Sequence, residues 1–357
     1  MGKHRTPDLR ATPDSRAIRN VVLAMIGLTI VVVGMIASYS GAFAKPTLHH
    51  MAVAVAAPQQ VLDGIRGQDA LAVTEVGDAA AARQKVYERD TDAAFVVAPN
   101  GEMKIYVAGG GGRSVATAAE TVGRSIAAKA GLRASVEDVA PASAGDPSGT
   151  VEFYAIIFIS IGATVGATVV GRIMGTVRKP ATLALRTMTL TGYSALLAAG
   201  VTLYVDVILD ALTAHTWQLF GVLWLYAMAV GGAVTGVAAA FGTVASMALT
   251  LFLVVIGNTA AAGPVGRPLL SGFYSTFTAI VPQGSGVSLL RSVEYFGGNG
   301  AQTPLVTLAI WGAAGCALAV LATAARVNYR ALYERYLPGS AGRDRAVLRP
   351  RFLSPAD

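Results

Sequence analysis

The sequence predicts a polytopic α-helical membrane protein with six transmembrane helices, a re-entrant hairpin, and an α/β extracytoplasmic domain inserted between helices 1 and 2. Three observations carry this prediction: six long uncharged stretches, a sorting of charge by segment, and one long segment of mixed composition. Each uncharged stretch can cross a hydrocarbon core of ~30 Å as a helix that rises ~1.5 Å per residue. The six stretches are 21–43, 153–171, 187–205, 217–240, 242–262 and 305–325.

The basic residues indicate how these helices are oriented. Sixteen of the 28 Lys and Arg residues lie in three segments, 1–20, 172–186 and 326–357, whereas segment 44–150 has a slight excess of acidic residues. Because basic loops stay in the cytoplasm, we expect a multi-pass protein of the cell membrane with both termini cytoplasmic and segment 44–150 outside. The basic segments would also contact the anionic lipid bilayer. No basic face interleaved with aromatic residues points to nucleic acid.

These observations divide the chain into five expected parts. They are a cytoplasmic basic tail (1–20), transmembrane helix 1 (21–43), the α/β domain (44–150), transmembrane helices 2–6 (151–325) and a second basic tail (326–357). The first stretch ends in Ala-Phe-Ala, which resembles a signal-peptide cleavage site. Since signal-peptide cores span only ~7–15 residues, the greater length of this stretch favours an uncleaved anchor.

Segment 44–150 alternates strand and helix patterns in the order β-α-β-α-β-β-α-β. Asp78 and Ser114 are expected to cap its second and third helices. Gly109–Gly112 matches no known phosphate-binding fingerprint and predicts a flexible break before the third helix. Segment 141–149, rich in Pro, Gly, Ser and Ala, predicts a linker into the membrane.

Residues 268–290 are uncharged but interrupted by Gly272, Pro282, Gly284 and Gly286. A seventh crossing here would place the basic C-terminal tail outside, against the usual charge distribution. We therefore expect two short helices that dip into the outer leaflet and turn back near Pro282, with Gly284 and Gly286 allowing the sharp turn. Broken backbone at membrane depth is tolerated where it is buried or lines a wet cavity. The hairpin is thus a candidate outer mouth of a path across the membrane.

Arg291 follows this hairpin. It and Arg267 are the two basic residues expected outside after position 150. In a pore mouth, one interpretation is that Arg291 pairs with Glu294 at i+3 or meets an anionic head group. The favoured interpretation is an interfacial anchor.

Asp206 and Asp210 lie one helical turn apart at the outer end of the third stretch. A proton or cation relay is one interpretation, because ionisable groups in spans are functional by default. Their place at the end of the stretch favours the wet interface instead.

Two small-residue motifs, Gly162-xxx-Gly166 and Gly232-xxx-Gly236, allow helix backbones to approach closely. Packing within the monomer is the first interpretation of both motifs, and a dimer interface is the alternative. The single Cys316 excludes a disulfide within one chain.

The layout and several short motifs resemble a known family. The motifs are Gly257-Asn258, Gly263-Pro264, Pro268-Leu269-Leu270, Val281-Pro282-Gln283-Gly284, Leu290-Arg291 and Glu294-Tyr295-Phe296-Gly297. The layout of the chain is one helix, a large outer domain, four helices, a re-entrant pair and a last helix. This layout and these motifs together resemble the type-2 ABC exporter permeases. The nearest branch is the actinobacterial phage-infection-protein and nitrosoguanidine-resistance group.

The resemblance implies a permease subunit that exports a hydrophobic or amphipathic compound as a homo- or heterodimer energised by a separate ABC ATPase. The candidate outer-mouth residues are Pro264, Pro268, Pro282, Gly284, Arg291 and Glu294. The candidate coupling loop contains Arg178, Lys179 and Arg186. No Walker motif makes the chain its own ATPase, and no catalytic set, metal cluster or cofactor signature indicates an enzyme. The alternative function is a non-transporting cell-envelope protein whose outer domain binds a surface partner.

Overall fold

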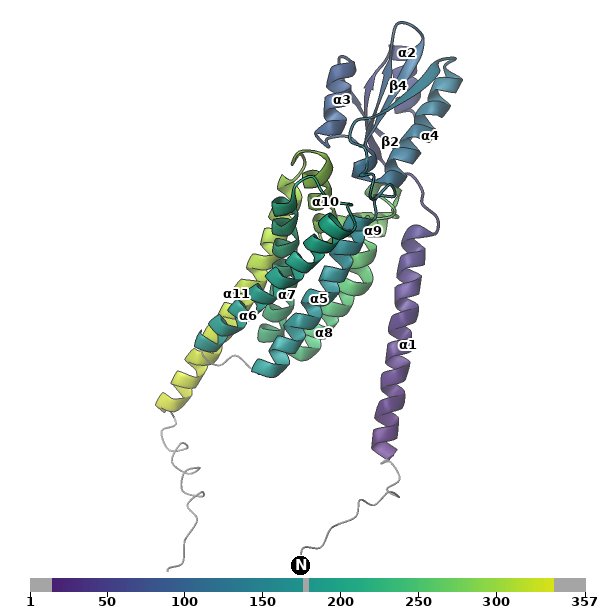
Figure 1. The fold of residues 1–357 in the computed structure, drawn as a ribbon. Helices are drawn as coiled ribbons and strands as arrows, with labels where there is room; N and C mark the ends of the chain where they lie inside the picture. The colour runs from purple at the N-terminus through teal and green to yellow at the C-terminus, as the bar shows by residue number, and fades with distance from the viewer. Residues whose placement is uncertain (1–14, 176–179, 337–357) are drawn as a thin grey trace, which may run out of the picture.

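The computed structural model describes residues 15–175 and 180–336, and Figure 1 shows a small sheet domain seated on one end of a helical bundle. Most of the two basic tails lies outside the described residues, as do the candidate coupling residues Arg178 and Lys179. Long apolar helices together with a mixed α/β sheet confirm the coarse fold class, a polytopic membrane protein with a small α/β domain.

The sheet domain has the element order that the sequence predicts. Its strands form one sheet in the order β2-β1-β3-β4-β5, in which β3 and β4 are antiparallel and the other neighbours are parallel. The strands are β1 (Met51–Ala56), β2 (Leu71–Glu75), β3 (Ala93–Val97), β4 (Glu102–Val107) and β5 (Arg133–Asp138). The helices are α2 (Gln59–Arg66), α3 (Ala79–Tyr87) and α4 (Arg113–Lys129).

Both faces of the sheet are covered. Alternate residues of a strand point to opposite faces, so Val53 and Phe95 pack with the apolar side chains of α2 and α4. Ala54 and Ala94 point the other way and pack with α3. A sheet covered on both sides has a continuous apolar pattern in its central strands, which is why these strands are recognisable in the sequence.

One of the two predicted helix caps is present. The Ala81 amide donates to Asp78 Oδ1 at 2.8 Å, as expected for the start of α3. The predicted cap at Ser114 is wrong, because α4 begins at Arg113. Ser114 Oγ instead accepts a hydrogen bond of 3.0 Å from the amide of Gly266, so it connects the sheet domain to the membrane part of the chain.

Five helices among the described residues are long and apolar enough to cross a membrane. They are α1 (Ser15–Phe43), α5 (Val151–Met174), α6 (Pro180–Thr202) with its π-helical extension Leu203–Ile208, α7 (Thr216–Phe241) and α11 (Gln302–Tyr336). The remaining expected span, 242–262, contains a shorter apolar helix, formed by α8 (Thr243–Phe252) and the π-helical turn Leu253–Gly257. This helix falls short of the ~20 residues of an untilted crossing.

Glycines bring the bundle helices into close contact. A Cβ atom at Gly236 of α7 would lie 2.2 Å from the carbonyl oxygen of Gly315 in α11. One at Gly166 of α5 would lie 2.2 Å from a ring carbon of Tyr193 in α6, whose hydroxyl donates to Gly162 O at 2.9 Å. Both small-residue motifs therefore pack within the chain, as their first interpretation predicts.

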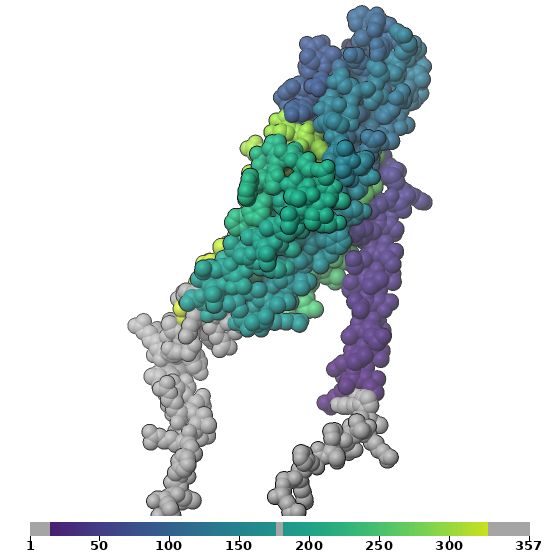
Figure 2. Space-filling view, in the orientation of Figure 1, coloured from purple at the N-terminus to yellow at the C-terminus, as the bar shows by residue number. Residues whose placement is uncertain are grey.

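Helix α1 stands apart from the bundle along most of its length (Figures 1 and 2). Its buried residues are Ser38 and Ala42, both near its C-terminal end. There the hydroxyl of Tyr274 donates to Ser38 Oγ at 3.1 Å. The rest of the helix leaves its apolar side chains to the lipid.

Two short helices, α9 (Gly272–Thr278) and α10 (Pro282–Tyr295), occupy the expected hairpin and lie at the sheet-domain end of the bundle. Pro282 is the first residue of α10, a position where proline is well tolerated. The expected role of Gly284 and Gly286 as the turn is wrong, because both are helical. Cβ atoms there would lie 2.0 Å from Thr278 O and 2.7 Å from Ile156 Cδ1, so these glycines allow α10 to pack closely.

The predicted orientation can be tested by accessibility labelling. In a Cys316→Ser background, a cysteine at Ser143 in the linker is expected to react with an impermeant thiol reagent in intact cells. A cysteine at Thr182, at the start of α6, is expected to react only after the cells are opened. Labelling of the Thr182 site alone in intact cells would reverse the orientation.

Candidate functional site

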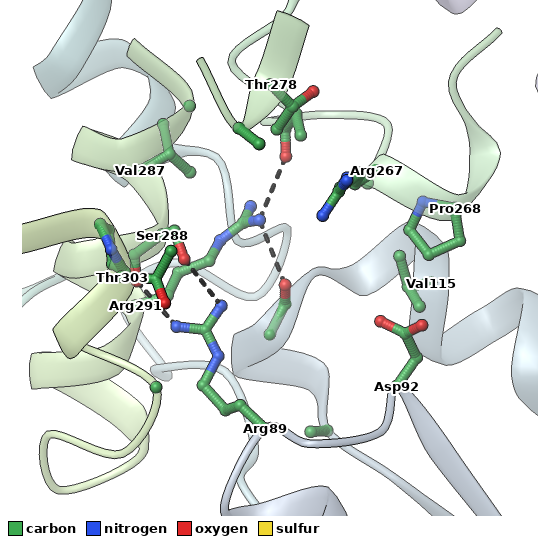
Figure 3. A pocket seen from close by; sticks show the side chains of 18 of the residues that line it. Arg89, Asp92, Val115, Arg267, Pro268, Thr278, Val287, Ser288, Arg291 and Thr303 are labelled. Carbon is green, nitrogen blue, oxygen red and sulfur yellow. Dashed lines mark hydrogen bonds between the residues drawn. The ribbon is translucent and has the colours of Figure 1, made fainter. Parts of the chain in front are cut away.

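A cavity of about 360 Å³ lies where the sheet domain meets α10 (Figure 3). Its walls come from the end of α3, the glycine turn after β4, the irregular segment 261–268, and the buried face of α10. Three arginines line it, Arg89, Arg267 and Arg291, together with one carboxylate, Asp92. The cavity therefore carries a net positive charge.

Arg291 is the structural centre of this junction. Its side chain is only 4% exposed and donates to four backbone carbonyl oxygens. They belong to Gly111 at 3.1 Å, Gly149 at 3.2 Å, Ala262 at 3.2 Å and Gly263 at 3.1 Å. A guanidinium can hold several acceptors in one plane, so this residue joins the sheet domain, the linker and the segment after α8 to α10.

Arg89 approaches the same helix from the sheet domain. It donates to Ser288 O at 2.7 Å and to the hydroxyl of Ser292, and its guanidinium lies 5.0 Å from the ring centroid of Phe296. Burial, followed by the positive charge of Arg291, lowers the pKa of Arg89 to about 10. The group remains charged at neutral pH, so two cations, Arg89 and Arg291, lie close together in the cavity and Asp92 only partly offsets their charge.

Arg267 is the arginine that the structure leaves free. It is exposed, and its side chain makes no hydrogen bond or ion pair with any residue in the described part of the chain. Figure 3 shows it on the opposite wall from Arg89. Burial raises the pKa of the nearby Asp92 carboxyl, against the opposing effects of the Ala52 amide, Arg89 and Arg267. Loss of the Asp92 charge would make the cavity still more positive.

The glycine turn Gly109–Gly111 explains how the two parts fit together. A Cβ atom at Gly110 would lie 2.4 Å from Tyr295 Cγ, and one at Gly111 would lie 3.3 Å from Phe296 Cζ. The segment expected to be a flexible break is thus a packed contact with the end of α10. Glycine is needed here because the backbone approaches aromatic rings directly.

The predicted outer-mouth residues divide into two groups. Pro268, Gly284 and Arg291 line the cavity, whereas Pro264, Pro282 and Glu294 do not. The Arg291–Glu294 pair, one of the interpretations of the sequence, is wrong, since Glu294 Oε1 accepts from the amides of Thr213 at 2.9 Å and Ala214 at 3.0 Å. Arg291 is also too deeply buried for an interfacial anchor.

The other candidates lie away from this cavity. Asp210 is exposed, with a positive φ of 54°, in the turn after α6, and Asp206 is partly exposed one turn earlier. Neither carboxylate forms an ion pair with a described residue, and neither lines the cavity. Arg186, proposed for a coupling loop, is only 6% exposed inside the opposite end of the bundle.

Sequence reasoning missed Arg89 and Asp92. Both follow α3 in a polar loop, where charged residues are common, and nothing local shows that the loop faces α10. Asp146 was missed as well. Its Oδ2 accepts from the amides of Thr150 and Val151 at 2.7 and 2.6 Å and so caps α5.

No family model matches this chain, and neither the curated proteins nor the solved structures contain a match. The class of protein is therefore defined by the fold and the site alone. It is a multi-pass membrane protein whose small α/β domain closes over an arginine-lined cavity at one end of the helical bundle.

Proposed function

We propose that the protein is a membrane permease subunit that exports an amphipathic compound and that the arginine-lined cavity binds the compound on its way out. The observation that supports this function is the combination of a net positive cavity, a free cation at Arg267, and a position between the bundle and the sheet domain. Concave sites with a few convergent polar groups are the usual form of small-molecule sites. The positive charge favours compounds with an anionic head group.

The proposal places the sheet domain on the outer side, over the exit. It also includes a separate ATPase subunit, because this chain contains no motif for ATP hydrolysis. A dimer is included because the resemblance to type-2 ABC exporter permeases implies one. Purification of the tagged chain from its native host is expected to recover an ATPase. A transport activity that persists in purified, reconstituted protein without any ATPase would remove that part of the proposal.

Transport is tested in cells by the retention of an anionic amphipathic dye, dodecanoyl-aminofluorescein. Arg267→Glu is expected to slow its efflux about tenfold at low dye concentration, because a charge-assisted contact is replaced by repulsion. Asp92→Asn is expected to have the opposite effect, since it increases the positive charge of the cavity.

The matched control is Arg113→Glu, a charge reversal at an exposed position on α4 outside the cavity. It is expected to leave efflux unchanged. Equal efflux in all four proteins and in cells without the chain would instead favour the non-transporting envelope protein.

A further inference from the structure

A second cavity, of about 220 Å³, lies at the opposite end of the bundle from the sheet domain. It is enclosed by the end of α5, the start of α6, the junction of α7 with α8, and α11. Arg172, Arg186 and Arg326 line it, and none of the described residues in its lining is acidic. Three cations thus share one space with no counter-charge from the described chain.

Arg186 is the most deeply buried of the three arginines, and it lacks a partner for its charge among the described residues. It is 6% exposed, its buried Nε has no hydrogen-bond partner, and its side chain forms no ion pair with any described residue. A Cβ atom at Gly171 would lie 2.6 Å from Arg186 Nη2, so the neighbouring helix makes room for the guanidinium. A buried charge is costly unless it is paired. The structure therefore indicates an anion that the described residues do not provide.

Further donors surround the same space. Arg172 is exposed and without a partner among the described residues, while Arg326 donates one N–H group to Ala239 O. Helix α8 begins at Thr243, which lines the cavity, so the unpaired amides of its first turn and its helix dipole also favour an anion. Guanidinium groups and helix amides are the donors typical of phosphate recognition.

The surroundings of the cavity indicate where the anion comes from. Ile173 is 80% exposed, Phe241 68% and Val244 83%. Ile173 and Val244 follow the lining residues Arg172 and Thr243 in the chain, and Phe241 lies between the lining residues Ala239 and Thr243. Large apolar side chains this exposed belong at the level of the lipid. The arginines consequently lie at the boundary between hydrocarbon and head groups, where the positive-charge bias of the sequence places the cytoplasmic leaflet.

We propose that this cavity binds the phosphate group of one anionic phospholipid from the adjacent leaflet, with Arg186 as the buried contact and Arg172 and Arg326 at the rim. The acyl chains would remain in the bilayer beside the exposed apolar residues. The inference concerns lipid binding and does not depend on the proposed export function.

The test is native mass spectrometry of the purified full chain in detergent, titrated with dioleoyl-phosphatidylglycerol. One lipid per chain is expected to remain bound. Arg186→Gln is expected to weaken this binding about tenfold, the loss expected for one charge-assisted hydrogen bond. Arg186→Lys keeps the charge but not the planar arrangement of N–H donors. The lipid affinity of this variant is therefore expected to lie between those of the wild type and Arg186→Gln.

Arg172→Gln and Arg326→Gln change exposed rim residues, and each is expected to weaken binding even if Arg186→Gln fails to fold. The matched control is Arg19→Gln on α1, expected to bind as wild type does. Unchanged affinity in every cavity variant would overturn the proposal. Equal binding of dioleoyl-phosphatidylcholine would exclude selection for an anionic lipid, and displacement by millimolar inorganic phosphate would show that the site takes free phosphate instead.

Discussion

Arg291→Met is expected to loosen the sheet domain from the bundle and to lower the stability of the whole chain. Methionine fills similar space but leaves four carbonyl oxygens without their donor. Hydrogen bonds to a charged group contribute ~1.5–3 kcal/mol each, and unmade buried ones are costly, so we expect a loss of roughly 3 kcal/mol or more. The measurement is thermal unfolding in detergent, together with the rate of proteolysis in the linker 141–149.

Arg113→Met serves as the control for this substitution, because the Arg113 side chain is exposed at the start of α4 and does not line the cavity. It is expected to melt and to be cleaved as the wild type does. If Arg291→Met also behaved like wild type in both measurements, Arg291 would not hold the two parts of the protein together.

Gly236→Val is expected to disrupt the contact between α7 and α11. The added Cβ would lie 2.2 Å from the backbone oxygen of Gly315, and a backbone atom in a packed helix cannot move aside as a flexible side chain can. Overpacking of this kind costs ~1–3 kcal/mol and sometimes more. A lower yield of monodisperse protein and a lower unfolding temperature are expected.

Gly221→Ala provides the comparison on the same helix, because a Cβ at Gly221 meets nothing within 4 Å. Alanine favours a helix over glycine by up to ~1 kcal/mol, so this variant is expected to be at least as stable as wild type. Equal stability of the two variants would mean that the glycine contact between α7 and α11 contributes little.

The features that could be predicted from the sequence are those that depend on interactions between residues close together in the chain. The apolar central strands, the cap at Asp78 and the long uncharged helices follow from hydrogen-bonding needs and from side-chain polarity along a short stretch of chain. The order of strands and helices in the sheet domain is confirmed for this reason. The length of α8 was overestimated, since polarity alone does not show that the helix ends before the irregular segment that contacts Arg291.

The arginine-lined cavity could not be predicted, because it is formed by contacts between residues that are far apart in the chain. Arg89 and Arg291 are far apart in the chain and meet because a glycine turn lets the sheet domain sit directly on α10. The sequence left Arg291 with three interpretations (a pair with Glu294, a lipid head group or an interfacial anchor), yet its partners are carbonyl oxygens from three other segments of the chain. Gly284 and Gly286 show the same limit, because a glycine needed for close packing looks identical in sequence to one needed for a turn.

The arginine-lined cavity connects the fold to the proposed function. Its structural arginines, Arg89 and Arg291, use their donors to attach the sheet domain to α10, while Arg267 has none of its donors engaged by the described chain. The same junction therefore supplies both a rigid frame and a free cation. Substitution of Arg267 is expected to alter binding with little effect on folding, in contrast to Arg291.

The most direct test of this account is the affinity of purified protein for dodecanoyl-aminofluorescein, measured by fluorescence anisotropy in detergent. We expect Arg267→Glu to weaken binding about tenfold, as the loss of one charge-assisted contact predicts, Asp92→Asn to strengthen it, and Arg113→Glu to leave it unchanged. The same affinity in all of these proteins would contradict the claim that the cavity binds an anionic amphipathic compound.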